Sequence, residues 1–300
     1  MADFILSSFA DESADRLDDQ LRFSQENDVH AIEMRNVDGK NVTDLTPAEA
    51  KSVAEKLRAK GVVLSAVGSP MGKIGVNDPF EPHLDKFRRC VEIARVLGAR
   101  YIRMFSFYTP EGTDPASCRD TVMERLSRFV EACEGSGVVC CHENEKGIFG
   151  NVPERCLDIL KTFDGKILGI FDPANFIQES VQTVPAWDML EPYIEYFHIK
   201  DALMESGKVT PAGKGDGHVP ELLSRFARKE GTRFLTVEPH LALFTGFSDL
   251  ESTSDNKTPP FTYHSREEAY GTAVGALKKI LAGMSYTERK TAGGTPVWSR

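Results

Sequence analysis

The sequence predicts an α/β protein, a (β/α)8 TIM barrel that forms a single domain. Short apolar runs alternate with longer amphipathic stretches along the chain, and eight such pairs can be counted. The starts of the apolar runs lie roughly 27 to 40 residues apart, which is the spacing of βα units. The glycine fingerprint expected after the first strand of an open, doubly wound sheet is missing. We expect the barrel to cover residues 1–284 and residues 285–300 to form a polar C-terminal tail.

The first half of the chain is expected to contribute four strands and four helices. Acids at positions 11 and 12 suit the positive N-terminal end of the first helix. Thr46 and Pro47 supply a cap and a first helical residue for the second helix, which Gly61 ends. The expected strands are 4–9, 31–34, 62–67 and 101–105, and the helices run over about 11–27, 46–60, 79–97 and 114–134.

The second half repeats this pattern with strands that end in polar residues. Residues 207–217 form a glycine-rich loop, and residues 241–263, rich in Ser, Asp, Thr and Pro, suggest a long surface loop or lid. This loop, or the loop at 68–78, could cover the barrel mouth or form a contact in a homo-oligomer. The expected strands are 138–141, 167–171, 194–197 and 234–237, and the helices begin at 153, 187, 219 and 265.

The composition and net charge indicate a globular protein and argue against some classes of partner. Hydrophobic residues make up 41% and charged residues 27%, as in a globular protein with a large core. The net charge of -9 argues against nucleic acid or an anionic membrane as the main partner, because both require a basic surface. None of the six cysteines forms a C-x-x-C pair, and no signal peptide or membrane span is evident. We therefore expect a cytoplasmic protein with a small-molecule substrate.

The candidate site consists of the residues that end four consecutive strands, Glu143, Asp172, His198 and Glu238. The C-terminal ends of all barrel strands meet on one face, so these side chains should be neighbours. Each pair of these carboxylates at about 4 Å would repel by about 4 kcal/mol at an effective dielectric constant near 20. A divalent metal removes that repulsion. Three oxygen donors and one nitrogen donor suit Mn²⁺, Mg²⁺ or Co²⁺ and admit Zn²⁺.

Such a metal site would leave positions open for a substrate that chelates through a carbonyl and an adjacent hydroxyl. The arrangement favours removal of a proton from the carbon next to the carbonyl, which gives an enediolate. Glu143 and Glu238 would lie on opposite sides of this substrate, one taking the proton and the other returning it. The alternative is that these strand-end residues only cap the helices that follow them.

Further polar residues are expected at the barrel mouth. Arg35 and Arg103 each end a strand and could anchor a substrate carboxylate or phosphate, or could form salt bridges with neighbouring acids. Lys200 could hold a substrate anion or pair with Asp201. His240 lies two residues beyond Glu238 on the same face, which favours a supporting role there.

An ordered set of motifs carries a family resemblance. The segments are Glu143-Asn144, Asp172-Pro173-Ala174-Asn175, His198-Ile199-Lys200-Asp201, Gly213-Lys214-Gly215-Asp216 and Glu238-Pro239. The set resembles the sugar phosphate isomerase/epimerase family, the xylose isomerase-like TIM barrels, over nearly the whole chain.

The resemblance implies that Glu143, Asp172, His198 and Glu238 bind one divalent metal, for which we expect Mn²⁺ first. It implies that the two glutamates act as acid and base in ketose epimerisation or aldose-ketose isomerisation. Asn175 falls in a family motif and is expected to bind substrate. Glu145 stands where many members have histidine, and Lys214 where an acid is common. We expect Glu145 to contact substrate too.

The leading hypothesis is thus a metal-dependent isomerase or epimerase of a sugar, polyol or hydroxy-ketone. Alternatives are a metal-dependent dehydratase or lyase of a keto-polyol, which would expel water, and a barrel that binds metal or sugar without catalysis. An apurinic endonuclease would share the barrel but needs a basic DNA groove, and the charge of -9 argues against it.

Overall fold

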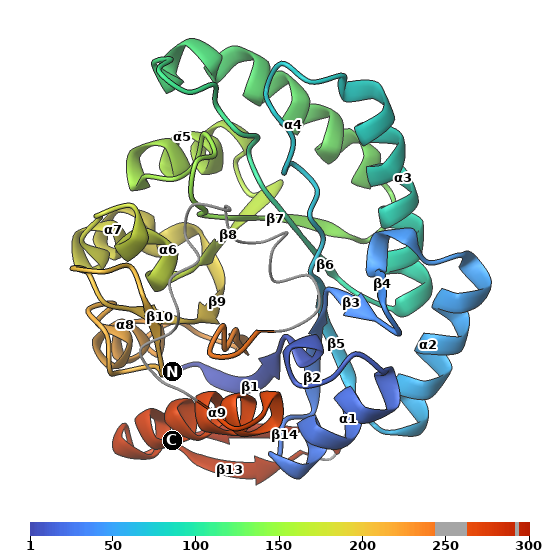
Figure 1. Ribbon diagram of the computed structural model, residues 1–300, viewed down its shortest axis with the longest axis vertical. Coiled ribbons are helices and arrows are strands. Elements are labelled where there is room, and N and C mark those ends of the chain that lie inside the picture. Colours follow the sequence, from blue (N-terminus) through green and yellow to red (C-terminus); the bar gives the residue numbers. More distant parts are fainter. Residues whose placement is uncertain (244–262, 292–293) are drawn as a thin grey trace.

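The computed structural model describes residues 1–243, 263–291 and 294–300. Eight parallel strands form a closed ring in the order β1-β12-β9-β8-β7-β6-β5-β2, and β2 returns to lie against β1 (Figure 1). The predicted (β/α)8 barrel is confirmed. The strands are β1 (Asp3–Ser8), β2 (Ala31–Met34), β5 (Val63–Val67), β6 (Tyr101–Met104), β7 (Val139–Glu143), β8 (Ile167–Phe171), β9 (Ile194–Ile199) and β12 (Thr232–Val237).

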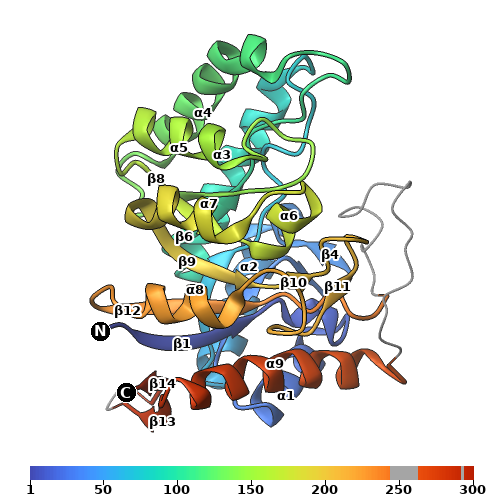
Figure 2. The ribbon, with the colours of Figure 1, turned by 90° about the vertical axis from the view of Figure 1, so that its left-hand side faces the viewer.

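The helices pack outside this ring (Figures 1 and 2). The second begins with the predicted cap, where the Thr46 side chain accepts from the Glu49 amide and Glu49 reaches back to Thr46. The helices are α1 (Leu17–Glu26), α2 (Pro47–Ala59), α3 (Phe80–Leu97), α4 (Arg119–Cys133), α5 (Pro153–Phe163), α6 (Pro173–Gln178), α7 (Thr183–Leu190), α8 (Val219–Phe226) and α9 (Arg266–Gly283). None of the helices in the described ranges is long and apolar enough to cross a membrane.

The barrel interior is built in layers, and the layers place the site. Ala66, Tyr101, Cys141, Ile170 and Tyr196 form a buried apolar cluster inside the ring. Side chains alternate along a strand, so the residue two positions further on faces the same interior, one layer closer to the C-terminal mouth. The residues two positions after Tyr101, Cys141, Ile170 and Tyr196 are Arg103, Glu143, Asp172 and His198. By this rule they face the interior one layer closer to the mouth. The apolar interior therefore becomes polar within one layer.

Two local predictions near the N-terminus and after β8 were wrong. No helix begins at Asp11; residues Ala10–Glu12 form a single 3-10 turn and α1 starts at Leu17. The physical reason is that both acids turn inward and bind Arg35 rather than a helix end. The helix expected to begin at 187 begins earlier, at Thr183, and α6, directly after β8, was not predicted.

The C-terminal segment also differs from the expected polar tail. Strands β13 (Thr287–Lys290) and β14 (Pro296–Ser299) pair with each other, and β14 adds antiparallel to β1 with Trp298 opposite Phe4. The indole packs on the main core, which explains why this segment joins the fold and why the two termini lie side by side (Figures 1 and 2). Most of the loop predicted at 241–263 lies outside the described residues.

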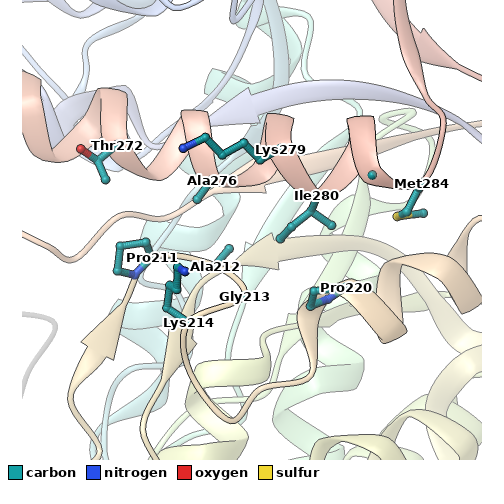
Figure 3. Close-up of a pocket in the computed structure, with 11 residues that line it drawn as sticks. Pro211, Ala212, Gly213, Lys214, Pro220, Thr272, Ala276, Lys279, Ile280 and Met284 are labelled. Carbon is teal, nitrogen blue, oxygen red and sulfur yellow. The ribbon is translucent and has the colours of Figure 1, made fainter.

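One cavity of about 590 Å³ lies outside the barrel mouth, between loop 211–214 and the face of α9 (Figure 3). Its lining is mainly apolar, with Ile280 on the helix, Met284 directly after the helix end and Pro220 at the start of α8. None of the four candidate metal ligands lines it.

Candidate active site

The structure brings the four predicted strand-end residues together. Glu143, Asp172, His198 and Glu238 each offer one donor atom, and these atoms all lie within 4.8 Å of one another. All four side chains are buried. They converge because β7, β8, β9 and β12 are successive neighbours in the ring and point the same way.

This donor set fits one divalent ion. Four atoms bound to one ion at about 2.1 Å lie at most about 4.2 Å apart, so the observed spacing requires only small side-chain movements. Three carboxylates and one imidazole offer the oxygen and nitrogen donors that Mn²⁺, Mg²⁺, Co²⁺ and Zn²⁺ accept. The described residues thus contain a group that could hold a metal.

His198 is oriented by a residue that sequence reasoning missed. Its Nδ1 lies 2.8 Å from Glu143 Oε1, whereas its Nε2 lies 3.1 Å from Glu33 Oε2. The Tyr196 hydroxyl donates to the other oxygen of Glu33 at 3.2 Å. The contact to Glu33 leaves Nδ1 facing the cluster, as expected of an imidazole whose second nitrogen is held by a carboxylate. An acid inside an apolar strand was the signal that could have revealed Glu33.

Electrostatics around His198 favour a charged imidazole when no metal is bound. Burial lowers the pKa of His198, but the carboxylates of Glu143 and Glu33 outweigh it and raise the pKa to about 10. Burial likewise raises the pKa of Glu143, but His198 and Arg103 lower it to about 2. Glu143 is therefore an ionised carboxylate at neutral pH.

Lys200 lies between two of the candidate ligands. Its Nζ is 2.9 Å from Asp172 Oδ2 and 3.1 Å from Glu238 Oε2, so it partly neutralises both carboxylates. Burial raises the pKa of Asp172 to about 7, with the charge of Lys200 opposing and that of Glu238 adding to the rise. Burial also raises the pKa of Glu238, but Lys200 and His240 bring it well below its usual value.

Asp172 both caps the helix that follows it and belongs to the cluster of candidate metal ligands. Its Oδ1 accepts from the Asn175 amide and caps α6, while its Oδ2 faces Lys200. The Asn144 side chain holds the Asp172 backbone through reciprocal hydrogen bonds, both of 2.9 Å. The Asn175 side chain donates to Glu143 Oε1 at 3.4 Å, so Asn175 borders the cluster.

Both predicted arginines face the site and are bound to acids. The Arg35 guanidinium forms a bidentate pair with Asp11, with distances of 2.9 and 3.1 Å. Its Nη1 lies 3.5 Å from Glu238 Oε1. Arg103 donates to Glu143 Oε2 at 3.3 Å. The salt-bridge alternative is thus present for both, and their contact with substrate stays a prediction.

His240 lies beside Glu238, with its Nε2 3.2 Å from Glu238 Oε1. Together with Glu12 these residues form a second group of donor atoms within 4.8 Å. This group shares Glu238 with the first group and offers three donors rather than four, so we place the metal in the first group. Glu12 and Asp11 escaped sequence reasoning because they resembled a helix start.

The glycine-rich loop encloses a carboxylate of the chain itself. Asp201 accepts hydrogen bonds from the backbone amides of Gly213, Gly215 and Gly217, at 2.8, 3.0 and 2.9 Å. A Cβ added at Gly215 would lie 2.4 Å from Asp201 Oδ1, so glycine is required there. Lys200 accordingly pairs with Asp172 and Glu238 rather than with Asp201.

Comparisons with known proteins agree with this architecture. A family model described as "Xylose isomerase-like TIM barrel" matches residues 21–279. A comparison with curated proteins gave no match.

Three solved structures illustrate the likeness. A D-tagatose 3-epimerase-like protein has a TM-score of 0.70 at 17% identity, covering 93% of this chain and 98% of that chain. The IOLI protein with a binding zinc atom has a TM-score of 0.69 at 15% identity, covering 93% and 98%. The probable 3-DHS dehydratase AsbF from Bacillus anthracis has a TM-score of 0.70 at 14% identity, covering 93% and 99%. At these identities the likeness concerns the fold.

Proposed function

The chain belongs to the xylose isomerase-like TIM barrel family, and from this premise we propose that it is a divalent-metal-dependent isomerase or epimerase. Its substrate would be a sugar, polyol or hydroxy-ketone that reacts through an enediolate. The observation that carries the proposal is the buried group Glu143, Asp172, His198 and Glu238, whose donor atoms lie within 4.8 Å of one another.

The four residues would hold the metal, and Mn²⁺ is the ion we propose first. When bound, the ion supplies a Lewis acid that polarises a substrate carbonyl and makes the proton on the adjacent carbon more acidic. His198 would bind through Nδ1, because Glu33 holds Nε2. Lys200 and Arg103 would limit the negative charge around the site.

Glu143 and Glu238 would move the proton. Both have a pKa below the usual value, so both are ionised at neutral pH and able to accept a proton. They flank His198, whose Nδ1 lies 2.8 Å from Glu143 and 3.6 Å from Glu238. The carboxylate on one side would take the proton from the substrate carbon. The carboxylate on the other side would first take up a proton from solvent and then deliver it to the opposite face of that carbon, each transfer being worth about 10²- to 10⁴-fold in rate.

Metal affinity should rise with pH. A metal must displace the proton on His198 Nδ1, which is present below the pKa of about 10. It must also displace the proton that Asp172 carries below its pKa of about 7. We expect the apparent Kd to fall about tenfold per pH unit between roughly pH 7 and 9, and to change more steeply below pH 7. Competition titrations with a chelator would measure the slope, and an affinity independent of pH would contradict this proton displacement.

The test of function is exchange of the proton α to the carbonyl in D₂O. Metal-loaded protein would be incubated with ketoses and followed by NMR, which also identifies the products. Deuterium at the α-carbon with interconversion of epimers or of aldose and ketose supports the proposal. A product that has lost water would instead identify a dehydratase.

A further inference from the structure

One wall of the barrel mouth is assembled from three loops held together by backbone hydrogen bonds. The amides of Phe105, Phe107 and Tyr108 donate to the carbonyls of Met71, Gly72 and Ile74, at 2.8 to 3.0 Å. The amide of Phe149, beyond β7, donates to Phe107 at 2.9 Å. The loops after β5, β6 and β7 therefore form one connected unit.

The backbone of this wall adopts costly conformations to make these contacts. Gly72 has a φ of +91°, and a Cβ there would lie 2.1 Å from the Phe105 carbonyl oxygen. Phe107, a bulky buried residue, has a φ of +65°. Such strain persists only where surrounding contacts enforce it, and it concentrates at binding and catalytic sites. We therefore regard the wall as a preformed surface rather than a chance arrangement of loops.

The wall carries an ion pair beside the candidate metal ligands. Lys73 Nζ lies 2.8 Å from Glu145 Oε2 and 4.5 Å from the centre of the Phe105 ring. Glu145 follows Glu143 by two residues, at the start of the loop that leaves β7. The half-exposed ring of Tyr108 lies near Gly147 in the same wall. The pair thus lies in the wall next to the C-terminal end of β7.

These groups have the chemistry of a subsite for hydroxyl groups. An ammonium donates hydrogen bonds and a carboxylate accepts them, so a hydroxyl can bond to both at once. Aromatic rings offer faces for the C–H groups of a carbon chain. Lys73 and Glu145 together carry no net charge, so a phosphate with a charge of about -1.5 to -2 gains no net attraction from the pair and lies beside a carboxylate that repels it.

Arg35, Arg103 and Lys200, which are basic groups at the site, are also engaged by acids. The amides of the glycine-rich loop already bind Asp201. These positive groups are thus matched by negative charges of the chain itself. An uncharged ligand disturbs this balance least.

We propose that Lys73 and Glu145 form a specificity-determining subsite that binds hydroxyls of the substrate, and that the substrate is an uncharged polyhydroxy carbonyl compound rather than a phosphate ester. The inference rests on the function proposed above and names the substrate class of the same site.

The test compares matched ligand pairs without requiring turnover. Protein loaded with diamagnetic Mg²⁺ would be titrated by ligand-observed NMR with D-fructose and D-fructose 6-phosphate, and with D-ribulose and D-ribulose 5-phosphate. We expect the unphosphorylated ketose to have the lower Kd by about tenfold or more. A tighter phosphate ester, or no binding of either unphosphorylated ketose, would overturn the inference.

Two variants with opposite expected effects make the test specific. Glu145→Gln removes the repulsive carboxylate and should reduce the preference for the unphosphorylated ketose over its phosphate ester at least about fivefold. Lys73→Met leaves the charge of Glu145 uncompensated and should increase that preference. Glu55→Gln, an exposed residue on α2, is the matched charge control and should change nothing. An unchanged preference in Glu145→Gln would overturn the inference.

Proton exchange on the same samples separates this inference from the proposed function. Exchange with the phosphate ester alone would contradict the substrate class and support the isomerase or epimerase. Selective binding of the unphosphorylated ketose without exchange would support the substrate class and contradict the isomerase or epimerase.

Discussion

Glu143→Gln is expected to lower the rate of α-proton exchange with one of the two epimers by about 10²- to 10⁴-fold at saturating metal. The amide keeps an oxygen that can face a metal, but it cannot accept the substrate proton. Glu143 is buried and held by His198 and Arg103, so no neighbouring carboxylate can simply take its place on the same side of the substrate. The measurement is NMR-detected deuterium incorporation from D₂O, with metal content determined on the same sample.

Glu238→Gln supplies the complementary variant. If two carboxylates act from opposite sides, each variant should fail to exchange the α-proton of one epimer and retain exchange with the other. Glu55→Gln again serves as the control, because its side chain is exposed on an outer helix. Normal exchange with both epimers in Glu143→Gln would exclude a catalytic role for that carboxylate.

Lys200→Met is expected to destabilise the metal-free protein by about 3 to 5 kcal/mol in its free energy of unfolding. Removing one partner of a buried ion pair leaves the other charge uncompensated. Here the ammonium contacts two buried carboxylates, Asp172 at 2.9 Å and Glu238 at 3.1 Å. Denaturant titrations with and without a divalent metal would measure the effect.

Added metal should restore a substantial part of the loss, because a dication bound to the same two carboxylates takes over their charge. A ligand at 100 times its Kd stabilises a folded protein by about 2.7 kcal/mol, and the gain should be larger in the variant than in the parent. Lys51→Met on α2, an exposed position, is the control. An equal loss of stability with and without metal would mean that Lys200 and the metal do not share these ligands.

The barrel and the strand-end residues could be predicted from sequence because both depend on short-range patterns. Fully buried parallel strands appear as continuous apolar runs, and such a run ending at Glu143 or Glu238 marks the mouth directly. Side-chain alternation also predicts which residues face the interior, since His198 lies two positions after the interior residue Tyr196.

The partners of those residues could not be predicted, because they come from distant parts of the chain. Glu33 contacts His198 across 165 positions, and the register irregularity between Ile32 and Glu33 in β2 has no evident sequence signal. Asp11 resembled a helix start, and its pairing with Arg35 emerged only in three dimensions. Local patterns thus locate a side chain on a face, but they do not identify which opposite charge will neutralise it.

Binding of one divalent metal by Glu143, Asp172, His198 and Glu238 can be measured by elemental analysis of protein purified without chelators. A His198→Ala variant would be analysed beside it, with circular dichroism to confirm that the variant is folded. About one divalent ion per chain is expected in the parent, and its loss is expected in the variant. Absence of bound metal in the parent, even after addition of Mn²⁺ or Co²⁺, would contradict metal binding by these four residues.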